Sequence, residues 1–148
     1  MKPAPLALTL GDPAGVGPEI IVKAWNELRK GGPPFLVVGD YQALASAGRA
    51  SVLKKVVAPA EAMSVFADAL PVLDLPLRAP VVAGQPSAAA APAIVKWIET
   101  AVGLALSGAV AGVVTAPIAK APLYEAGFKF PGHTEFLGEL TATESFEG

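Results

Sequence analysis

The sequence predicts an α/β fold in which a mainly parallel sheet is flanked by helices. Short apolar runs suited to buried strands alternate with segments of helical periodicity, and glycine-bearing loops join the two. The composition is 53% hydrophobic, which argues against disorder. A chain of 148 residues has the length of one ordinary domain and can bury a core.

The first predicted unit is a strand, a loop and a helix. Leu6–Leu10 is an apolar run that ends at the glycine-bearing loop Gly11–Glu19. Pro18 suits the first turn of a helix, where its missing N–H costs nothing, and two glycines after Lys30 favour a helix end. The helix should run over Pro18–Lys30. Its predicted buried stripe consists of Ile20, Ala24 and Leu28, with Ile21 and Trp25 beside it.

The rest of the chain repeats this alternation. Apolar runs predict further strands at Phe35–Val38, Ser51–Val57, Pro71–Leu75 and Ala109–Thr115. Between them we expect a short helix at Tyr41–Ala47, a helical turn or irregular loop at Ala60–Ala67, and a loop at Leu77–Pro86. A long helix follows, with Pro92 in its first turn or at a kink, and Ser107-Gly108 ends it. Its predicted stripe is Ile94, Ile98, Ala101 and Ala105, widened by Val95, Val102 and Leu106. The last predicted helices are Ala119–Ala126 and Thr134–Thr141.

Composition excludes several kinds of function. The net charge is −2 and no block of lysine or arginine is present, so we expect no nucleic-acid partner. The chain has no cysteine, which excludes disulfides and thiolate metal sites and fits a cytoplasmic protein. Prolines, glycines and charges interrupt every apolar run before it reaches membrane-spanning length, so no membrane partner is expected.

Two loops at strand ends are candidates for a shared ligand site, because ligands of parallel sheets bind beyond the carboxyl ends of the strands. GDPAGVGPE (Gly11–Glu19) lacks the third glycine of a dinucleotide fingerprint and the lysine of a Walker A loop. It is either an anion site at a helix N-terminus or a tight turn that needs positive φ at Gly15 or Gly17. Asp12 either binds a ligand or caps this turn with its carboxylate.

The second loop and a later stretch carry the other candidate residues. In TAPIAK (Thr115–Lys120), Lys120 holds a phosphate or carboxylate, lowers the pKa of a reacting hydroxyl, or is a solvated lysine. In PGHTEF, His133 is the sole histidine, so a helix-borne metal site with two histidines is excluded. His133 and Thr134 either line a site or cap a helix.

Four stretches in this order resemble the 4-hydroxythreonine-4-phosphate dehydrogenase family of pyridoxal phosphate biosynthesis. They are GDPAGVGPE, AGQPS (Ala83–Ser87), VVTAPIAK (Val113–Lys120) and AGFKFPGHTEFL (Ala126–Leu137). The resemblance covers Thr9 to about Thr141. It implies NAD(P)-dependent oxidation of 4-phosphohydroxy-L-threonine, then decarboxylation to 3-amino-2-oxopropyl phosphate, assisted by a divalent zinc, magnesium or cobalt ion. It also implies a homodimer with the two-lobed fold of isocitrate and isopropylmalate dehydrogenases.

The resemblance assigns roles to few residues of this chain. His133 and Thr134 match the family's substrate-binding pair, while Asp12 and Lys120 are candidates to line the site; no catalytic residue is assigned. The family's metal-binding histidines lie further along the chain, and no histidine follows His133 here. Family members are about twice this long, well above one ordinary domain. Residues 1–148 are therefore expected to be the N-terminal α/β part, without the second half.

Three expectations follow from this incomplete match. The tail Thr143–Gly148 is expected to depart from the family pattern, which suggests a truncation or a frameshift. The chain alone is expected to have little or no dehydrogenase activity. The alternatives are a dehydrogenase for another phosphorylated hydroxy acid, such as a phospho-threonate or phospho-erythronate, or a non-catalytic fragment that binds a phosphorylated ligand.

Overall fold

Within the part of the chain that the structure describes, the sheet is five-stranded and its paired strands are all parallel. The computed structural model describes residues 3–47, 52–78, 81, 84–85 and 88–116. The strands are β1 (Leu6–Thr9), β2 (Phe35–Gly39), β3 (Leu53–Lys55), β4 (Leu70–Asp74) and β5 (Val113–Thr115). Their order in the sheet is β3-β4-β2-β1-β5, with every neighbouring pair parallel. The predicted α/β fold with a mainly parallel sheet is confirmed.

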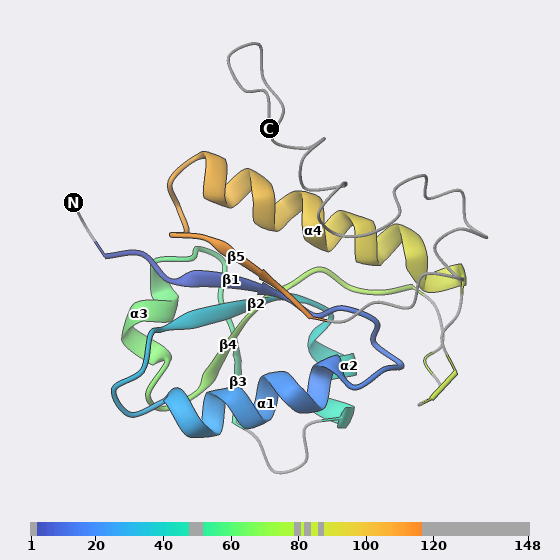
Figure 1. Cartoon of the computed structure of the whole chain (residues 1–148), viewed down its shortest axis with the longest axis horizontal. Coiled ribbons are helices and arrows are strands. Elements are labelled where there is room, and N and C mark those ends of the chain that lie inside the picture. The colour runs from blue at the N-terminus through green and yellow to red at the C-terminus, as the bar shows by residue number, and fades with distance from the viewer. Residues whose placement is uncertain (1–2, 48–51, 79–80, 82–83, 86–87, 117–148) are drawn as a thin grey trace.

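Helices cover both faces of the sheet. They are α1 (Gly17–Leu28), α2 (Tyr41–Ala47), α3 (Glu61–Val65) and α4 (Ala91–Leu106), the last preceded by the 3₁₀ turn η1 (Ala88–Ala90). The two longest helices, α1 and α4, lie on opposite sides of the strands (Figure 1), and α4 packs on β1, β2 and β5. The central strand β2 is buried at all five positions, as a strand covered on both faces should be.

Helix α1 buries a different face from the predicted one. Ile20 is 49% exposed, whereas Ile21, Val22 and Trp25 are buried. The Trp25 indole fixes this rotation, because its Nε1–H donates to the carbonyl oxygen of Phe66 at 2.7 Å. The stripe of Ile20, Ala24 and Leu28 is thus wrong as the main buried face, although its neighbours Ile21 and Trp25 are part of the core.

Two strands, β3 and β5, are shorter than the apolar runs from which they were predicted. Before β5, the N–H groups of Ala109 and Val110 both donate to the carbonyl of Leu104, so these residues form the turn that ends α4. After β3, the N–H groups of Val57 and Ala58 donate to Glu61 Oε1 and belong to the start of α3. Local capping therefore competes with the strand ladder at both places.

Helix α4 is the longest element of the described part. Pro92 lies in its first turn and Gly108, with φ of 83°, follows its end, as expected. Among the described residues, the helical segment Ala88–Leu106 has the length and the apolar composition needed to cross a membrane. Here its buried face includes Ile94, Trp97 and Ile98, and the Trp97 indole donates to the carbonyl of Leu75 at 2.9 Å. The helix thus has the packing of a core helix on a sheet.

Candidate functional site

The topology makes the carboxyl ends of β1 and β5 the candidate location of a ligand site. From β1 the chain moves to β2 on one side, while β5 joins β1 on the other side, so the strand order switches between β1 and β5. Open parallel sheets bind ligands at such switch points. Both candidate loops begin here, since Thr9 and Thr115 are partners in the β1–β5 register. The expected proximity of the two loop starts is confirmed.

The turn after β1 is built around Asp12. Its Oδ1 accepts the N–H of Ala14 at 2.9 Å, and its backbone carbonyl accepts the N–H of Gly15 at 3.0 Å. Asp12 is buried, so the carboxylate acts here as the cap of its own turn. The positive φ falls at Gly11, at 75°, so the expectation that Gly15 or Gly17 needs it is wrong.

Gly17 is required for close packing. A Cβ at this position would lie 2.7 Å from the backbone oxygen of Leu10 and 3.2 Å from the Cβ of Ala116. Only glycine therefore lets α1 begin directly against the ends of β1 and β5. The helix start carries no side-chain cap, which leaves its first N–H groups without the usual side-chain acceptor.

A third stretch reaches the same loop. The N–H of Gly84 donates to the carbonyl of Ala14 at 2.8 Å, and Gly84 has a positive φ of 77°. Gly84 belongs to the AGQPS stretch, seventy residues further along the chain than Ala14. Parts of GDPAGVGPE, AGQPS and VVTAPIAK thus converge at one edge of the sheet.

Thr9 is a site candidate that sequence reasoning missed. Its side chain is 1% exposed, and its hydroxyl has no hydrogen-bond partner within the described part of the chain. Side chains alternate along strands and register partners share a face, so Thr9 and Thr115 present neighbouring hydroxyls on the same face. The available signal was a single hydroxyl in the otherwise apolar run LALTL.

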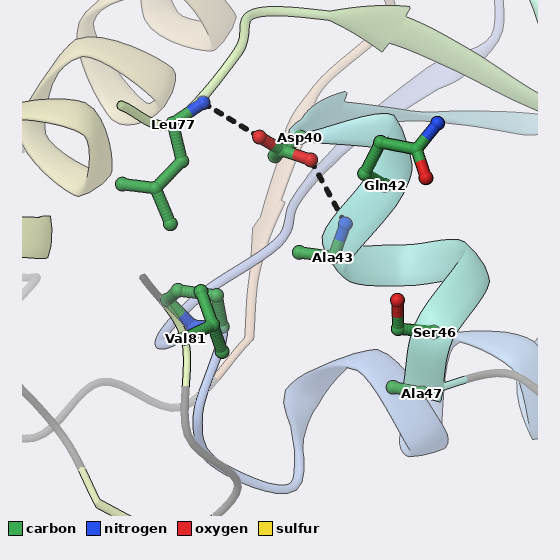
Figure 2. A pocket seen from close by; sticks show the side chains of 8 residues that line it. Asp40, Gln42, Ala43, Ser46, Ala47, Leu77 and Val81 are labelled. Atoms are coloured by element: carbon green, nitrogen blue, oxygen red, sulfur yellow. Dashed lines mark hydrogen bonds between the residues drawn. The ribbon is translucent and has the colours of Figure 1, made fainter. Parts of the chain in front are cut away.

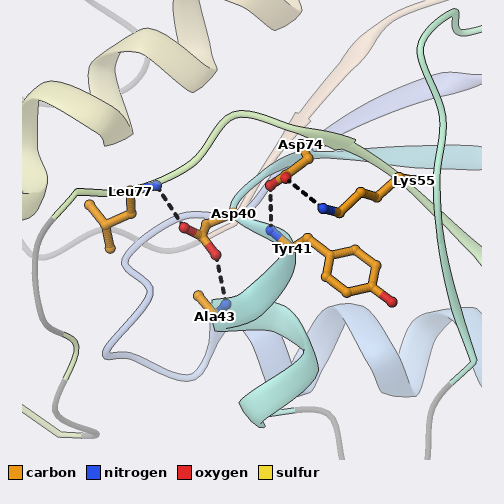
Figure 3. A network of polar contacts seen from close by, with 6 residues as sticks. All are labelled: Asp40, Tyr41, Ala43, Lys55, Asp74 and Leu77. Atoms are coloured by element: carbon orange, nitrogen blue, oxygen red, sulfur yellow. Dashed lines mark hydrogen bonds and ion pairs between the residues drawn. The ribbon is translucent and has the colours of Figure 1, made fainter.

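Two more carboxylates stand where β2 and β4 end (Figure 3). Asp40 accepts the N–H of Ala43 through Oδ1 at 2.8 Å and the N–H of Leu77 through Oδ2 at 2.6 Å. Asp74 accepts the N–H of Tyr41 at 2.8 Å and pairs with the Nζ of Lys55 at 3.3 Å. Each carboxylate joins segments that are distant in sequence. Together they fix the edge of the sheet beside the switch point.

A pocket of about 330 Å³ opens between α2 and the segment after β4 (Figure 2). Figure 2 shows Leu77 and Val81 on one side and residues of α2 on the other. The lining residues are Pro13, Asp40, Gln42, Ala43, Ser46, Ala47, Leu77 and Val81. Pro13 belongs to the Gly11–Glu19 loop, so the pocket adjoins the loop at the switch point.

Sequence comparison identifies the family. A family model described as "Pyridoxal phosphate biosynthetic protein PdxA" matches residues 32–147. The chain belongs to the PdxA family. The match extends through the tail, so the expectation that Thr143–Gly148 departs from the family pattern is wrong.

Relatives within the PdxA family agree in name and in fold. The 4-hydroxythreonine-4-phosphate dehydrogenase of Caulobacter vibrioides is 66% identical over 148 residues, which are 100% of this chain and 44% of that protein. The crystal structure of a 4-hydroxythreonine-4-phosphate dehydrogenase from Burkholderia phymatum has a TM-score of 0.84 at 33% identity, covering 95% of this chain and 44% of that one. The crystal structure of the 4-hydroxythreonine-4-phosphate dehydrogenase from Klebsiella pneumoniae has a TM-score of 0.79 at 38% identity, covering 93% of this chain and 44% of that one. The chain thus spans less than half the length of the PdxA relatives it matches.

Three of the predicted site residues lie outside the described residues. They are Lys120, His133 and Thr134, whose roles remain predictions. Within residues 3–47, 52–78, 81, 84–85 and 88–116, no group of three or more His, Cys, Asp or Glu side chains is placed to hold a metal ion. The described residues therefore do not fit the divalent metal that the PdxA resemblance implies.

Proposed function

We propose that the chain is the N-terminal α/β part of an NAD(P)-dependent 4-hydroxythreonine-4-phosphate dehydrogenase. The enzyme would oxidise 4-phosphohydroxy-L-threonine, and the product would lose carbon dioxide to give 3-amino-2-oxopropyl phosphate. Membership of the PdxA family and the names of the relatives support this activity. The observation that carries it is the convergence of three motif stretches at the switch point, through the Thr9–Thr115 register and the Gly84–Ala14 hydrogen bond.

The described edge fits a nicotinamide cofactor better than it fits a metal. The close start of α1 at Gly17 and its uncapped N–H groups suit a phosphate-bearing ligand beside the loop. A bound NAD(P) would supply the hydride acceptor for the alcohol oxidation. The chain's own contribution is positional: Asp12 holds the turn rigid, and Gly17 brings the helix start to the strand ends.

The proposed substrate contacts combine described and undescribed residues. Thr115, at the end of β5, offers a half-buried hydroxyl beside the buried hydroxyl of Thr9. Lys120 is proposed to hold the phosphate or carboxylate group, and His133 with Thr134 to bind the substrate, on the basis of the family resemblance. A phosphorylated substrate requires several such donors, because each charge-assisted hydrogen bond fixes one oxygen.

The chain alone is proposed to be inactive and to associate. The described residues do not provide a metal centre, and the family-length protein is more than twice as long. Val16 and Ile20, near the start of α1, and Val114, in the edge strand β5, are large apolar side chains exposed by 57%, 49% and 44%. Such surface favours contact with another part of the protein or another copy. We propose a homodimer in the cytoplasm.

An activity assay tests the proposal. The purified chain and a version extended to the length of the Caulobacter vibrioides relative are each given 4-phosphohydroxy-L-threonine, NAD or NADP, and a divalent metal. We expect the extended protein, but not the 148-residue chain, to form NADH or NADPH. Turnover by the 148-residue chain would refute its proposed inactivity, and faster turnover of a phospho-threonate or phospho-erythronate would replace the substrate.

A further inference from the structure

The hydroxyl of Thr9 is buried at the end of β1 and has no hydrogen-bond partner among the described residues. The side chain is only 1% exposed. A hydroxyl that loses its hydration and gains no partner destabilises the folded chain. Valine has nearly the same shape without a polar atom, and the other residues of LALTL are apolar. Packing alone would therefore favour valine here, so the hydroxyl indicates a role outside packing.

Thr9 lies on the face of the sheet that α4 covers. Its register partner in β2 is Val38, and Phe35, three residues earlier in that strand, points to the opposite face. On that opposite face the ring of Phe35 meets Phe66, whose carbonyl accepts the Trp25 indole of α1. Since α1 and α4 lie on opposite sides of the strands (Figure 1), Thr9 faces α4. The buried residues of α4 bring no side-chain oxygen to it.

Thr115 is the residue of the described part whose hydroxyl is best placed to meet that of Thr9. The two are partners in the β1–β5 register and share a face, and neighbouring strands lie about 4.8 Å apart. Burial fixes the Thr9 side chain, whereas Thr115 is half-buried and belongs to a short strand. A change of rotamer at Thr115 can therefore bring the two oxygens to hydrogen-bonding distance, about 2.8 Å.

The junction of β1 and β5 leaves room for this movement at its carboxyl end. At its start, the N–H of Ala7 donates to the carbonyl of Gly112 at 2.9 Å. At its end, the N–H of Ala116 donates to the carbonyl of Thr9 at 3.4 Å. Backbone hydrogen bonds are usually roughly 2.7–3.2 Å long, so the last one is weak. The end of β5 can thus shift against β1 more easily than its start can.

We propose that Thr9 is a positioning residue for the substrate and acts through Thr115. When the substrate binds, the Thr9 hydroxyl donates a hydrogen bond to Oγ1 of Thr115, and Thr115 donates one to an anionic oxygen of the phosphorylated substrate. The inference rests on the proposed function, since it needs that substrate at the switch point. A hydroxyl can accept and donate at the same time, and accepting a hydrogen bond in apolar surroundings makes Thr115 a stronger donor. Substrate binding thereby supplies the partner that Thr9 lacks in the free chain.

A double-mutant cycle in the extended protein tests this assignment. Thr9→Val should lower kcat/KM about three- to tenfold, as expected for one neutral hydrogen bond, and Thr115→Val about ten- to hundredfold, as expected for a bond to a charged group. The double variant should be no slower than Thr115→Val alone, because Thr9 acts only through Thr115. Thr9→Ser, which keeps the hydroxyl, should stay within about twofold of the unaltered protein. Thr100→Val, the same exchange at a half-buried position of α4, is the matched control and should change nothing.

Urea unfolding of the 148-residue chain supplies a measurement that does not depend on turnover. Thr9→Val should leave the midpoint unchanged or raise it, because it removes a buried hydroxyl without a partner. Thr9→Val and Thr115→Val should have additive effects on the midpoint, because no hydrogen bond joins the two hydroxyls in the free chain. A lower midpoint for Thr9→Val, or its failure to fold, would overturn the inference by showing that the hydroxyl stabilises the free chain.

The kinetic results can also overturn the inference. If the losses in kcat/KM of the two single variants multiply in the double variant, Thr9 does not act through Thr115, although the proposed activity stands. If the extended protein binds 4-phosphohydroxy-L-threonine without turnover, the proposed activity fails, and the same cycle is read from the Kd in calorimetric titration. Absence of binding at millimolar substrate would overturn both.

Discussion

Replacing Gly17 with alanine tests how tightly α1 is set against the strand ends. The added methyl group would lie 2.7 Å from the backbone oxygen of Leu10 and 3.2 Å from the Cβ of Ala116. The nearer atom is backbone, so it cannot move aside as the tip of a flexible side chain would. Helix α1 must shift away from β1 and β5, or the end of β1 must bend.

Two opposing contributions determine how Gly17→Ala changes the free energy of unfolding. Inserting a methyl group into a packed region typically costs about 1–3 kcal/mol. Alanine also restricts the unfolded chain more than glycine does, which offsets about 0.4–1 kcal/mol. The expected net result is a loss of about 1–2 kcal/mol in the free energy of unfolding. Because the shift opens the switch point, ligand binding there should weaken as well.

Gly103→Ala is the matched control for this change. Gly103 lies in the interior of α4, is exposed, and has no atom within 4 Å of a built Cβ. Alanine there should stabilise the helix by about 0.5–1 kcal/mol. Urea unfolding followed by circular dichroism measures both variants. If Gly17→Ala is as stable as the unaltered chain, or if both variants shift in the same direction, the close packing of α1 on β1 and β5 is wrong.

Three further outcomes are expected. Asp40→Ala should destabilise the chain by about 2–4 kcal/mol in urea unfolding, because the N–H groups of Ala43 and Leu77 both lose their acceptor. Asp40→Asn should destabilise it less, because one side-chain oxygen remains as an acceptor. Equal losses in the two variants would contradict the view that both oxygens of Asp40 accept stabilising hydrogen bonds. His133→Ala in the extended protein should raise KM or lower kcat by a large factor, and near-normal kinetics would return His133 to a helix-capping role. Light scattering should show a dimer or higher oligomer of the 148-residue chain, and a monomer at high concentration would count against association through exposed apolar surface.

The elements that the sequence predicted well are those decided by local chemistry. Apolar runs marked all five strands, and glycine ended the helices: Gly31 and Gly108 both have positive φ, at 105° and 83°. The positions of the two candidate loops followed from the alternation of strands and helices. These features depend on neighbouring residues, so a single sequence contains the information for them.

Other features depend on partners far along the chain. Apolar residues occupy so many positions of α1 that several faces could be buried, and the choice is fixed by a hydrogen bond from Trp25 to Phe66, 41 residues away. The Gly84–Ala14 contact and the capping of Leu77 by Asp40 likewise join distant segments. Thr9 looked like an ordinary strand residue, and only the register with Thr115 shows that it lies at the switch point.

The distribution of charge at this edge indicates how the complete site must be divided. Asp12, Asp40 and Asp74 stand at or just after the ends of three strands, and each accepts backbone N–H groups that hold a loop or helix start in place. Lys55 is occupied by Asp74. These carboxylates stiffen the edge but give it negative charge, which does not attract a phosphorylated substrate. Under the proposed function, the cations for the substrate's phosphate are therefore proposed to come from Lys120 or from the additional length of the PdxA relatives, and not from the strand ends described here.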